Sequence, residues 1–524
     1  MSDEQGQSTT HDEANEQQQD QPDDSEPSLD RQAELRAAYE ANVAAGKPPY
    51  AGVVIHTRGE VTWMVQERGW RTGEFDSFEQ SIDFRSAGFR AAVLSHVDFT
   101  HANLSGAVIN SSPFNNANLT LADLSGVFIV NSPFNNANLT LANLSGAVIN
   151  NSPFNNANLT LADLSGTSIT ESAFDAASFN SANLSGARIT NSPFNNADLS
   201  NADLSRVSIT ESTFDAASFS LADLSGVFIT ESPFNKADLR FADLSGIFIN
   251  KGIFNNADLT MADLSGARIG DSTFNDADLT GAKVCGAILV ADFSGVDMTQ
   301  VRMDSATMLG GTNNEGDAFQ LNAQSCLLDV AWNGAILANV RWDQLPRLGD
   351  EAAIKAATSR TERVGALRGT ARAYRGLAKA LQAQGLTIPA LKYRAREQQL
   401  ERRAQLYSFA IGPWLFSWLL NLVSGYGDNP GRALGCYLAV VGTFTGAYWA
   451  LTNQVLGGIQ SNSAHLAWYE ALVLSISSFH GRGFFPATLS LGDPIALVAA
   501  AEAIIGLFIE LVFIATFTQR FFAR

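Results

Sequence analysis

Cysteine and histidine are scarce in this sequence of 524 residues, which holds three cysteines and six histidines. Cys285, Cys326 and Cys436 lie far apart and form no Cys-x-x-Cys motif. We therefore expect single reduced thiols in a protein that faces the cytosol, with neither a disulfide framework nor a zinc site. The histidines are dispersed, and no nucleophile–base pair, metal-ligand cluster or phosphate-binding loop stands out. These absences argue against an enzyme and predict no cofactor and no bound metal.

Basic residues are also few, with 34 Lys and Arg against 53 Asp and Glu, for a net charge of −19. That sign argues against binding to nucleic-acid phosphates, so no nucleic-acid partner is expected. Much of the excess lies in residues 1–30, where Ser2–Asp30 holds ten acids and no Lys or Arg. Such a composition predicts a disordered acidic tail. The tail lacks both the basic start and the apolar core of a signal peptide.

Residues 31–72 are predicted to form an N-terminal cap of helix and strand. Gln32–Ala45 has helical spacing, and Val53–Ile55 and Val61–Val65 are predicted as two strands joined at Arg58–Gly59. Repeat arrays need shielded ends, so we expect this segment to cover the first repeat.

A repeat of five residues follows, in a domain that we place at residues 73–345. Large apolar residues recur at every fifth position from Phe84 to Leu289, and a small residue, often Ala, stands two positions before each. Five is the period of neither a helix nor a strand. It fits a chain that turns a corner every five residues, with the large and the small residue pointing inward. The five-residue period is interrupted near Ala291–Phe293.

A second period of twenty residues indicates that four corners make one coil. The motif Asn-Ser-Pro-Phe-Asn-Asn-Ala recurs at Asn131–Ala137, Asn151–Ala157 and Asn191–Ala197. Like residues would then stack, with phenylalanines in one column and isoleucines in the next. We expect about ten coils, which at a spacing of about 4.8 Å would form a rod on the order of 50 Å long.

These motifs resemble the pentapeptide-repeat family, which implies a right-handed quadrilateral β-helix. Some members of that family mimic DNA and inhibit topoisomerases. Here the outward positions hold many Asn, Ser and Thr, only a moderate excess of acids, and scattered basic residues such as Arg188 and Lys236. This surface favours a rigid cytosolic stalk, or a platform for a cytosolic protein partner, over DNA mimicry.

Residues 346–408 have helical spacing and are predicted as a cytosolic connector, broken at Gly385–Pro389. Its second half, Leu391–Leu406, is rich in basic residues, which form either a solvated helix face or a surface attracted to anionic lipid headgroups. Within residues 409–430, the aromatic segment Phe409–Val423 is too short to span a membrane. It predicts a helix lying in the interface, able to transmit movement of the β-helix to the membrane. A turn at Gly425–Asp428 would follow.

Residues 431–524 are predicted as an α-helical membrane domain. Two segments reach the roughly 20 apolar residues that a span needs, at residues 431–452 and 494–518. Between them, residues 465–486 read as a half-length helix and a glycine-rich bend, Gly481-Arg482-Gly483. Irregular backbone at membrane depth survives only where protein buries it or water bathes it. The sequence therefore predicts a loop that re-enters the membrane and lines a pore.

The distribution of basic residues predicts the orientation of these spans. Lys and Arg crowd before the first span and after the second, whereas the connecting segment Asn453–Asp493 holds only Arg482. By the positive-inside rule, both termini are expected in the cytoplasm and the loop enters from outside.

Span, short helix, Gly-x-Gly bend and second span resemble the pore-loop unit of the tetrameric potassium-channel superfamily. That resemblance places Gly481, Arg482 and Gly483 on the Gly-Tyr-Gly of the Thr-Val-Gly-Tyr-Gly filter, and Phe479 and His480 on Thr-Val. It implies a homotetramer around an axis, in contact with membrane lipid and permeant inorganic ions. Because these residues differ from Thr-Val-Gly-Tyr-Gly, the resemblance implies a selectivity that is not of the standard potassium type. The predicted selectivity filter consists of Ser477, Ser478, Phe479, His480, Gly481, Arg482 and Gly483.

Charged and glycine residues around this loop are the candidates for pore, gate or filter support. Arg482 either faces the axis, where four guanidinium groups would repel cations, or pairs with Glu470 or Glu502, since an unpaired buried charge is costly. Glu510 either forms a carboxylate ring in the inner cavity or bonds between helices. His480 either confers sensitivity to pH or serves as a plain hydrogen-bonding group. Gly506 is either a hinge or a site of close helix packing.

The whole chain resembles bacterial pentapeptide-repeat proteins that carry such an ion-channel domain. This resemblance implies a channel of the bacterial plasma (inner) membrane whose cytosolic β-helix is coupled to the gate. The alternative is a membrane-anchored scaffold whose repeats bind a partner and whose pore-like part does not conduct.

Overall fold

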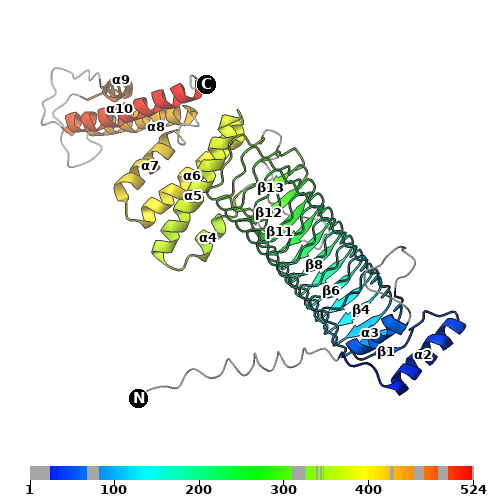
Figure 1. Ribbon diagram of the computed structural model, residues 1–524. Coiled ribbons are helices and arrows are strands. Elements are labelled where there is room, and N and C mark those ends of the chain that lie inside the picture. The colour runs from blue at the N-terminus through cyan, green and yellow to red at the C-terminus, as the bar shows by residue number, and fades with distance from the viewer. Residues whose placement is uncertain are drawn as a thin grey trace, which may run out of the picture. The chain divides into compact units, whose positions relative to one another are not determined.

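Figure 1 shows the computed structural model of the chain. It describes residues 24–67, 82–309, 325–337, 340, 342, 345, 347–424, 430–453, 465–481 and 494–521. The chain divides into two compact units. The first comprises Met1–Asp350 with Ala383–Gly385, and the second comprises Glu351–Gln382 with Leu386–Arg524.

The first unit is a parallel β-solenoid of about 11 turns, which confirms the predicted fold class. Neighbouring strands pair residues twenty positions apart, as in Ile109 with Ile129, so each coil contributes one strand to a single parallel sheet. From the first coil onward the strands are β2 Gly88–Arg90, β3 Val108–Asn110, β4 Phe128–Val130, β5 Val148–Asn150, β6 Ser168–Thr170, β7 Arg188–Thr190, β8 Ser208–Thr210, β9 Phe228–Thr230, β10 Phe248–Asn250, β11 Arg268–Thr273, β12 Ile288–Asp292 and β13 Met308–Leu309.

The core of the solenoid consists of stacked columns of identical residue types. Leu124 and the small residue two positions before it, Ala122, are both buried, and the same pair recurs in the neighbouring coils. Phenylalanines from Phe114 to Phe274 stack with ring centroids 4.6–4.9 Å apart. Both the inward positions and the phenylalanine column are as predicted. The spacing matches the distance between hydrogen-bonded strands.

A column of buried serines satisfies backbone groups inside the solenoid. The Ser112 N–H donates to Ser132 Oγ at 3.0 Å, and the Ser132 hydroxyl donates to the Val130 carbonyl at 2.8 Å. The same exchange repeats along the column through Ser212. Because buried backbone donors need partners, these hydroxyls hold each coil on the next where the strand ends.

The irregularity predicted at Ala291–Phe293 is a coil that is one residue short. Phe293 stacks on Phe274, nineteen positions earlier, at 5.3 Å. A register shift in β11 between Gly270 and Ser272 absorbs the difference. Beyond it, Asp292 pairs with Cys326. Cys326 is a free thiol, and burial raises its pKa to about 12.

Corners of the solenoid hold residues in the left-handed backbone region. Glycine occupies one corner in most coils, for example Gly186 (φ +68°) and Gly226 (φ +65°), whereas Arg206 takes that position with φ +59°. A residue with a Cβ atom is strained in this region, so glycine is the less costly choice.

We expect Arg206→Gly to stabilise its coil by about 1 kcal/mol, because the left-handed strain is relieved. Arg206 is exposed, so little packing is lost. Native-state hydrogen exchange of the amides in β7, β8 and β9 measures the change. The matched control is Gly246→Ala, where the added methyl group meets open space at φ +65°. It should cost about 1 kcal/mol, and equal protection of both variants would contradict the account.

The segment before the solenoid contains α2 (Leu29–Ala44), β1 (Val54–Ile55) and α3 (Arg58–Glu67). β1 pairs in parallel with β2, and the Tyr50 ring contacts that of Phe84 at 5.6 Å, so this segment covers the first coil. α2 begins three residues earlier than predicted. The predicted tail, residues 1–30, lies mostly outside the described residues.

The prediction of a strand at Val61–Val65 is wrong, because these residues belong to α3. The Glu60 N–H donates to the Thr57 hydroxyl at 3.1 Å, and the Glu60 carboxylate accepts the His56 N–H at 2.9 Å. The Thr57 hydroxyl therefore caps the start of the helix as in a capping box, while the Glu60 carboxylate bonds the N–H of His56, one residue before the cap. This cap overrides the strand preference of the β-branched residues that follow it.

The second unit is helical and contains α4 Glu351–Ala356, α5 Arg360–Ala383, α6 Thr387–Tyr407, α7 Ile411–Ser424, α8 Pro430–Thr452, α9 Trp468–Phe479 and α10 Pro494–Phe521. Gly385, with φ +76°, lies between α5 and α6, where the break was predicted. In the basic half of α6, Arg396 forms an ion pair of 2.7 Å with Glu351. Arg394 and Arg403 are exposed and so remain accessible to an anionic surface.

Two helices of this unit are long and apolar enough to cross a membrane. They contain the stretches Gly431–Thr452 and Pro494–Ala515, with mean hydropathies of 1.4 and 2.4. The shorter apolar helix Ile411–Val423 precedes them. These are the segments that the sequence predicts as two spans and one interfacial helix.

Candidate functional site: the apolar helices

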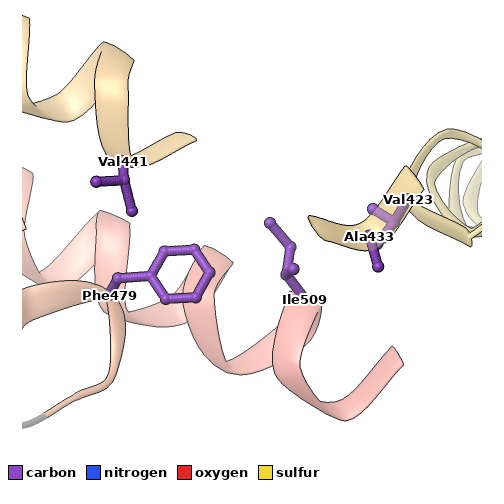
Figure 2. Close-up of a cluster of buried hydrophobic side chains, with 5 residues drawn as sticks. All are labelled: Val423, Ala433, Val441, Phe479 and Ile509. Atoms are coloured by element: carbon purple, nitrogen blue, oxygen red, sulfur yellow. The ribbon is translucent and has the colours of Figure 1, made fainter. Parts of the chain in front are cut away.

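The short helix α9 packs against both long apolar helices. Figure 2 shows one of the two contact clusters. Phe479 of α9 lies beside Val441 of α8 and Ile509 of α10, and Ala433 of α8 lies with Val423 of α7 on the other side of Ile509. The second cluster joins Ala471 and Leu474 of α9 to Tyr448 of α8 and to Ile495 and Ala499 of α10. With 12 residues, α9 is about half as long as α8, which has 23. These clusters hold both ends of α9 between the two long helices.

Local hydrogen bonds define where α9 begins and ends. At its start, the Glu470 carboxylate accepts the Ala467 N–H at 2.8 Å and caps the first turn. At its end, the Gly481 N–H donates to the Ser478 carbonyl at 2.9 Å, and Gly481 has φ +63°. A left-handed glycine just past the last turn is a common helix stop. The first glycine of the predicted filter therefore terminates a helix.

A buried carboxylate connects all three helices. The Glu502 side chain of α10 is fully buried. One of its oxygens accepts the Tyr448 hydroxyl of α8 at 2.7 Å, and the other is hydrogen-bonded to the Ser475 hydroxyl of α9. Ser475 Oγ also lies 3.0 Å from the Val441 carbonyl oxygen of α8. Because buried polar groups need partners, these bonds favour one docked position of α9.

A close backbone contact lies one turn further along α10. A Cβ atom added at Gly506 would come within 2.0 Å of the Phe479 carbonyl oxygen. Glycine therefore allows the end of α9 to lie directly against the backbone of α10. This contact is of the kind that the close-packing alternative for Gly506 describes.

His480 and Glu510 meet at the wall of a cavity. His480 Nδ1 is hydrogen-bonded to Glu510 Oε1, and both side chains are partly exposed. The cavity, of about 440 Å³, is lined by these two residues and by the apolar Ala433, Leu434, Tyr437, Phe479, Ile509, Phe513 and Ile514. Within one chain, Glu510 thus bonds between helices, the second of the two alternatives considered for it.

The short apolar helix α7 contacts the same cluster. Val423, near its end, is buried in the cluster of Figure 2, and the Phe416 ring contacts Phe508 of α10 at 6.2 Å. Its Trp418, Leu415 and Phe416 side chains are exposed. α7, which follows α6 in the chain, therefore contacts α8 and α10 through apolar side chains.

The structure brings some of the predicted site residues together and separates others. Phe479, His480, Gly506 and Glu510 meet at the end of α9, with Glu502 one turn away. Glu470 lies near the opposite end of α9, nine residues before Phe479 and on the order of 14 Å away along the helix. Ser478 and Phe479 are buried, whereas Ser477 is partly exposed and its hydroxyl donates to the Leu474 carbonyl. Arg482 and Gly483 lie outside the described residues.

Sequence reasoning missed three residues of this site: Tyr448, Ser475 and Tyr437. Tyr437 packs edge-on against Phe479 at 4.7 Å, and the other two bond Glu502. The available signal was polarity, since Tyr448 and Ser475 carry hydroxyl groups within otherwise apolar helices. A buried carboxylate in a span requires such partners.

The family model for pentapeptide repeats matches this chain in eight copies, over residues 87–126, 131–160, 157–196, 193–226, 232–270 and 253–289. These ranges coincide with the regular coils of the solenoid. No curated protein matches the chain in sequence.

Several solved structures are similar to the solenoid. HetL, a pentapeptide repeat protein involved in heterocyst differentiation regulation in Nostoc sp. strain PCC 7120, is 24% identical over 44% of this chain and 92% of its own, with a TM-score of 0.29. A thylakoid-lumen pentapeptide repeat protein of Arabidopsis thaliana is 31% identical over 19% and 63%, with a TM-score of 0.16. QnrB1, a plasmid-mediated fluoroquinolone resistance protein, is 20% identical over 38% and 91%, with a TM-score of 0.19. All three TM-scores are low, so the fold assignment rests on the coil geometry and the repeat model.

Proposed function

We propose that this chain, a pentapeptide repeat protein with two apolar helices long enough to span a membrane, is an ion channel. The observation that carries the proposal is the docking of the short helix α9 between α8 and α10. In this proposal α8 and α10 cross the membrane and α9 enters it part of the way. The backbone after Gly481 then lies at membrane depth, where it needs either protein or water around it.

Two spans and one loop cannot enclose a conduction path, so the proposal requires several copies around an axis. We propose a homotetramer, with the segment from Ser477 to Gly483 of each copy at the narrowest point. Phe479 is buried within its own chain. In this proposal its side chain does not face the axis, and its carbonyl oxygen, which lies against Gly506 of α10, does not contact the ion.

Coupling between solenoid and pore would run through α7. Its contacts with α8 and α10 provide a route by which movement of the connector helices reaches the Phe479 cluster. We propose that the solenoid and both termini lie in the cytoplasm of a bacterium and the helices in its inner membrane, in line with the distribution of basic residues.

The proposal is tested by recording from purified protein in planar lipid bilayers under asymmetric salt. Discrete currents that reverse sign with the applied potential are expected. Protein that inserts as an oligomer but stays electrically silent would instead support the alternative, a membrane-anchored scaffold that does not conduct.

Arg482 determines the charge selectivity in one of the two arrangements considered for it. If its guanidinium groups face the axis, Arg482→Ala should shift the reversal potential toward that of the cation, because four positive charges leave the narrowest point. If Arg482 is paired with a carboxylate, the variant should lose stability and keep its selectivity. The matched control is Arg432→Ala, which removes a basic residue at the start of α8. An unchanged reversal potential in a stable Arg482→Ala channel would exclude both roles.

A further inference from the structure

One corner of the solenoid carries a row of exposed apolar side chains at intervals of twenty residues. Their exposed fractions range from 39% for Leu121 to 59% for Leu221. We call this row the apolar corner, and it consists of Leu121, Leu141, Leu161, Leu221, Phe241 and Met261. In the two coils between Leu161 and Leu221, the same position holds the exposed polar residues Ser181 and Asn201.

The apolar corner combines two features that are unfavourable for the isolated solenoid. All six residues have φ between +59° and +62°, in the left-handed region that favours glycine and asparagine. Their side chains also point into solvent and not into the core. Ser181, Asn201 and Gly281 show that the same corner accepts polar or small residues. Six apolar residues at strained, exposed positions therefore indicate a surface that is covered by a partner.

We propose that a second copy of this chain packs side by side along the apolar corner, in register. Neighbouring coils are about 4.8 Å apart, so a partner must offer apolar groups at that repeat over several coils. A second copy has this spacing and the same polar interruption. When the twofold axis of the contact runs parallel to the row, each residue meets its own counterpart, so Leu161 meets Leu161 and Ser181 meets Ser181.

The two copies run in the same direction in this arrangement. In each copy the candidate membrane helices, α8 and α10, follow the solenoid in the chain. Two copies that are anchored in one membrane and related by a twofold axis perpendicular to it point in the same direction along that axis. An antiparallel pair would also place apolar on apolar, for example Leu121 on Met261, and the cross-linking experiment below distinguishes the two arrangements. The inference requires membrane anchoring and does not require conduction.

Cysteine cross-linking of the full chain in liposomes tests this arrangement. With Cys285, Cys326 and Cys436 replaced by alanine, Ser181→Cys should form a disulfide-linked dimer on oxidation with copper phenanthroline. Arg188→Cys provides the control, because Arg188 is exposed in β7 away from the corner. It should give little dimer. A mixture of Ser181→Cys and Asn201→Cys chains should give mainly dimers of like chains, whereas mainly mixed dimers would indicate the antiparallel pair.

Substitutions in the corner separate association from folding. The double variant Leu161→Asn, Leu221→Asn removes apolar area and places asparagine where the left-handed backbone favours it. When this double variant is made in the Ser181→Cys chain, the fraction of cross-linked dimer should fall about tenfold or more, because four apolar side chains per pair are lost. The thermal midpoint of the solenoid should stay the same or rise. The control is Phe228→Ser, at an equally exposed apolar residue of another column. It should change neither the dimer fraction nor the thermal midpoint.

Three results would overturn the inference. These are equal cross-linking at residues 181 and 188, cross-linking that survives the double asparagine variant, and a preference for the mixed 181–201 pair. A silent channel with intact cross-linking at residue 181 would overturn the proposed conduction and leave this contact in place.

Discussion

Gly506→Ala is expected to abolish conduction and to release α9 from α10. The added Cβ atom would lie 2.0 Å from the Phe479 carbonyl oxygen, and both atoms belong to, or are attached to, helix backbone. Neither can move without separating the helices. Overpacking of a tight contact costs about 1–3 kcal/mol, and we expect the upper end of that range here. Hydrogen exchange across residues 468–481 should therefore accelerate by roughly 100-fold.

The control for this prediction is Gly446→Ala in α8. A Cβ atom there meets no atom within 4 Å, and alanine is a better helix former than glycine. This variant should keep both the conductance and the slow exchange of α9. A Gly506→Ala protein that conducts normally and protects α9 as the wild type does would show that the close contact between Gly506 and Phe479 is unimportant.

Glu502→Ala is expected to destabilise the three-helix contact by about 3 kcal/mol. The substitution leaves the hydroxyls of Tyr448 and Ser475 without their carboxylate partner in a buried site, at a cost of about 1–3 kcal/mol for each. The measurement is the thermal midpoint of the membrane-reconstituted protein, together with hydrogen exchange of α9. Conduction should be lost in parallel.

Glu502→Gln separates hydrogen bonding from charge. The glutamine amide has one acceptor and one donor group, and the two hydroxyls can rotate to match them. The variant should therefore lose less than about 1 kcal/mol, and Tyr448→Phe about 1 kcal/mol. Leu497→Ala, on the exposed side of α10, serves as the control. If the alanine and glutamine variants are equally stable, Glu502 does not connect the helices as described.

The solenoid could be predicted because each of its coils follows the same rule. One large apolar residue and one small residue, often Ala or Ser, occupy each side, so a period of five gives the corners and a period of twenty gives the stacking. Even the short coil at Phe293 is visible in the sequence as an interruption of the five-residue period. The two long apolar helices follow from length and composition. Val61–Val65 was assigned wrongly because its β-branched residues suggested a strand, while the hydroxyl cap at Thr57 starts a helix.

The site was less predictable because its bonds join distant parts of the chain. Glu502, Gly506 and Glu510 stand out in the sequence as charged or small residues within an apolar segment. Their partners do not, since Tyr448 and Ser475 lie 54 and 27 positions from Glu502. Which hydroxyl meets the carboxylate is decided by the packing of the three helices and cannot be read from the spacing of residues along the sequence. Sequence reasoning considered Glu502 as a partner for Arg482, whereas the described residues bond it to Tyr448 and Ser475.

Ion flux into liposomes tests the central claim most directly. Purified wild-type protein, Gly506→Ala and Gly446→Ala are reconstituted at equal density, and the collapse of a salt gradient is followed with a potential-sensitive dye. We predict rapid collapse with the wild type and Gly446→Ala and none with Gly506→Ala. Wild-type vesicles that hold the gradient as long as empty ones, while the protein is inserted and folded, would contradict the proposed channel.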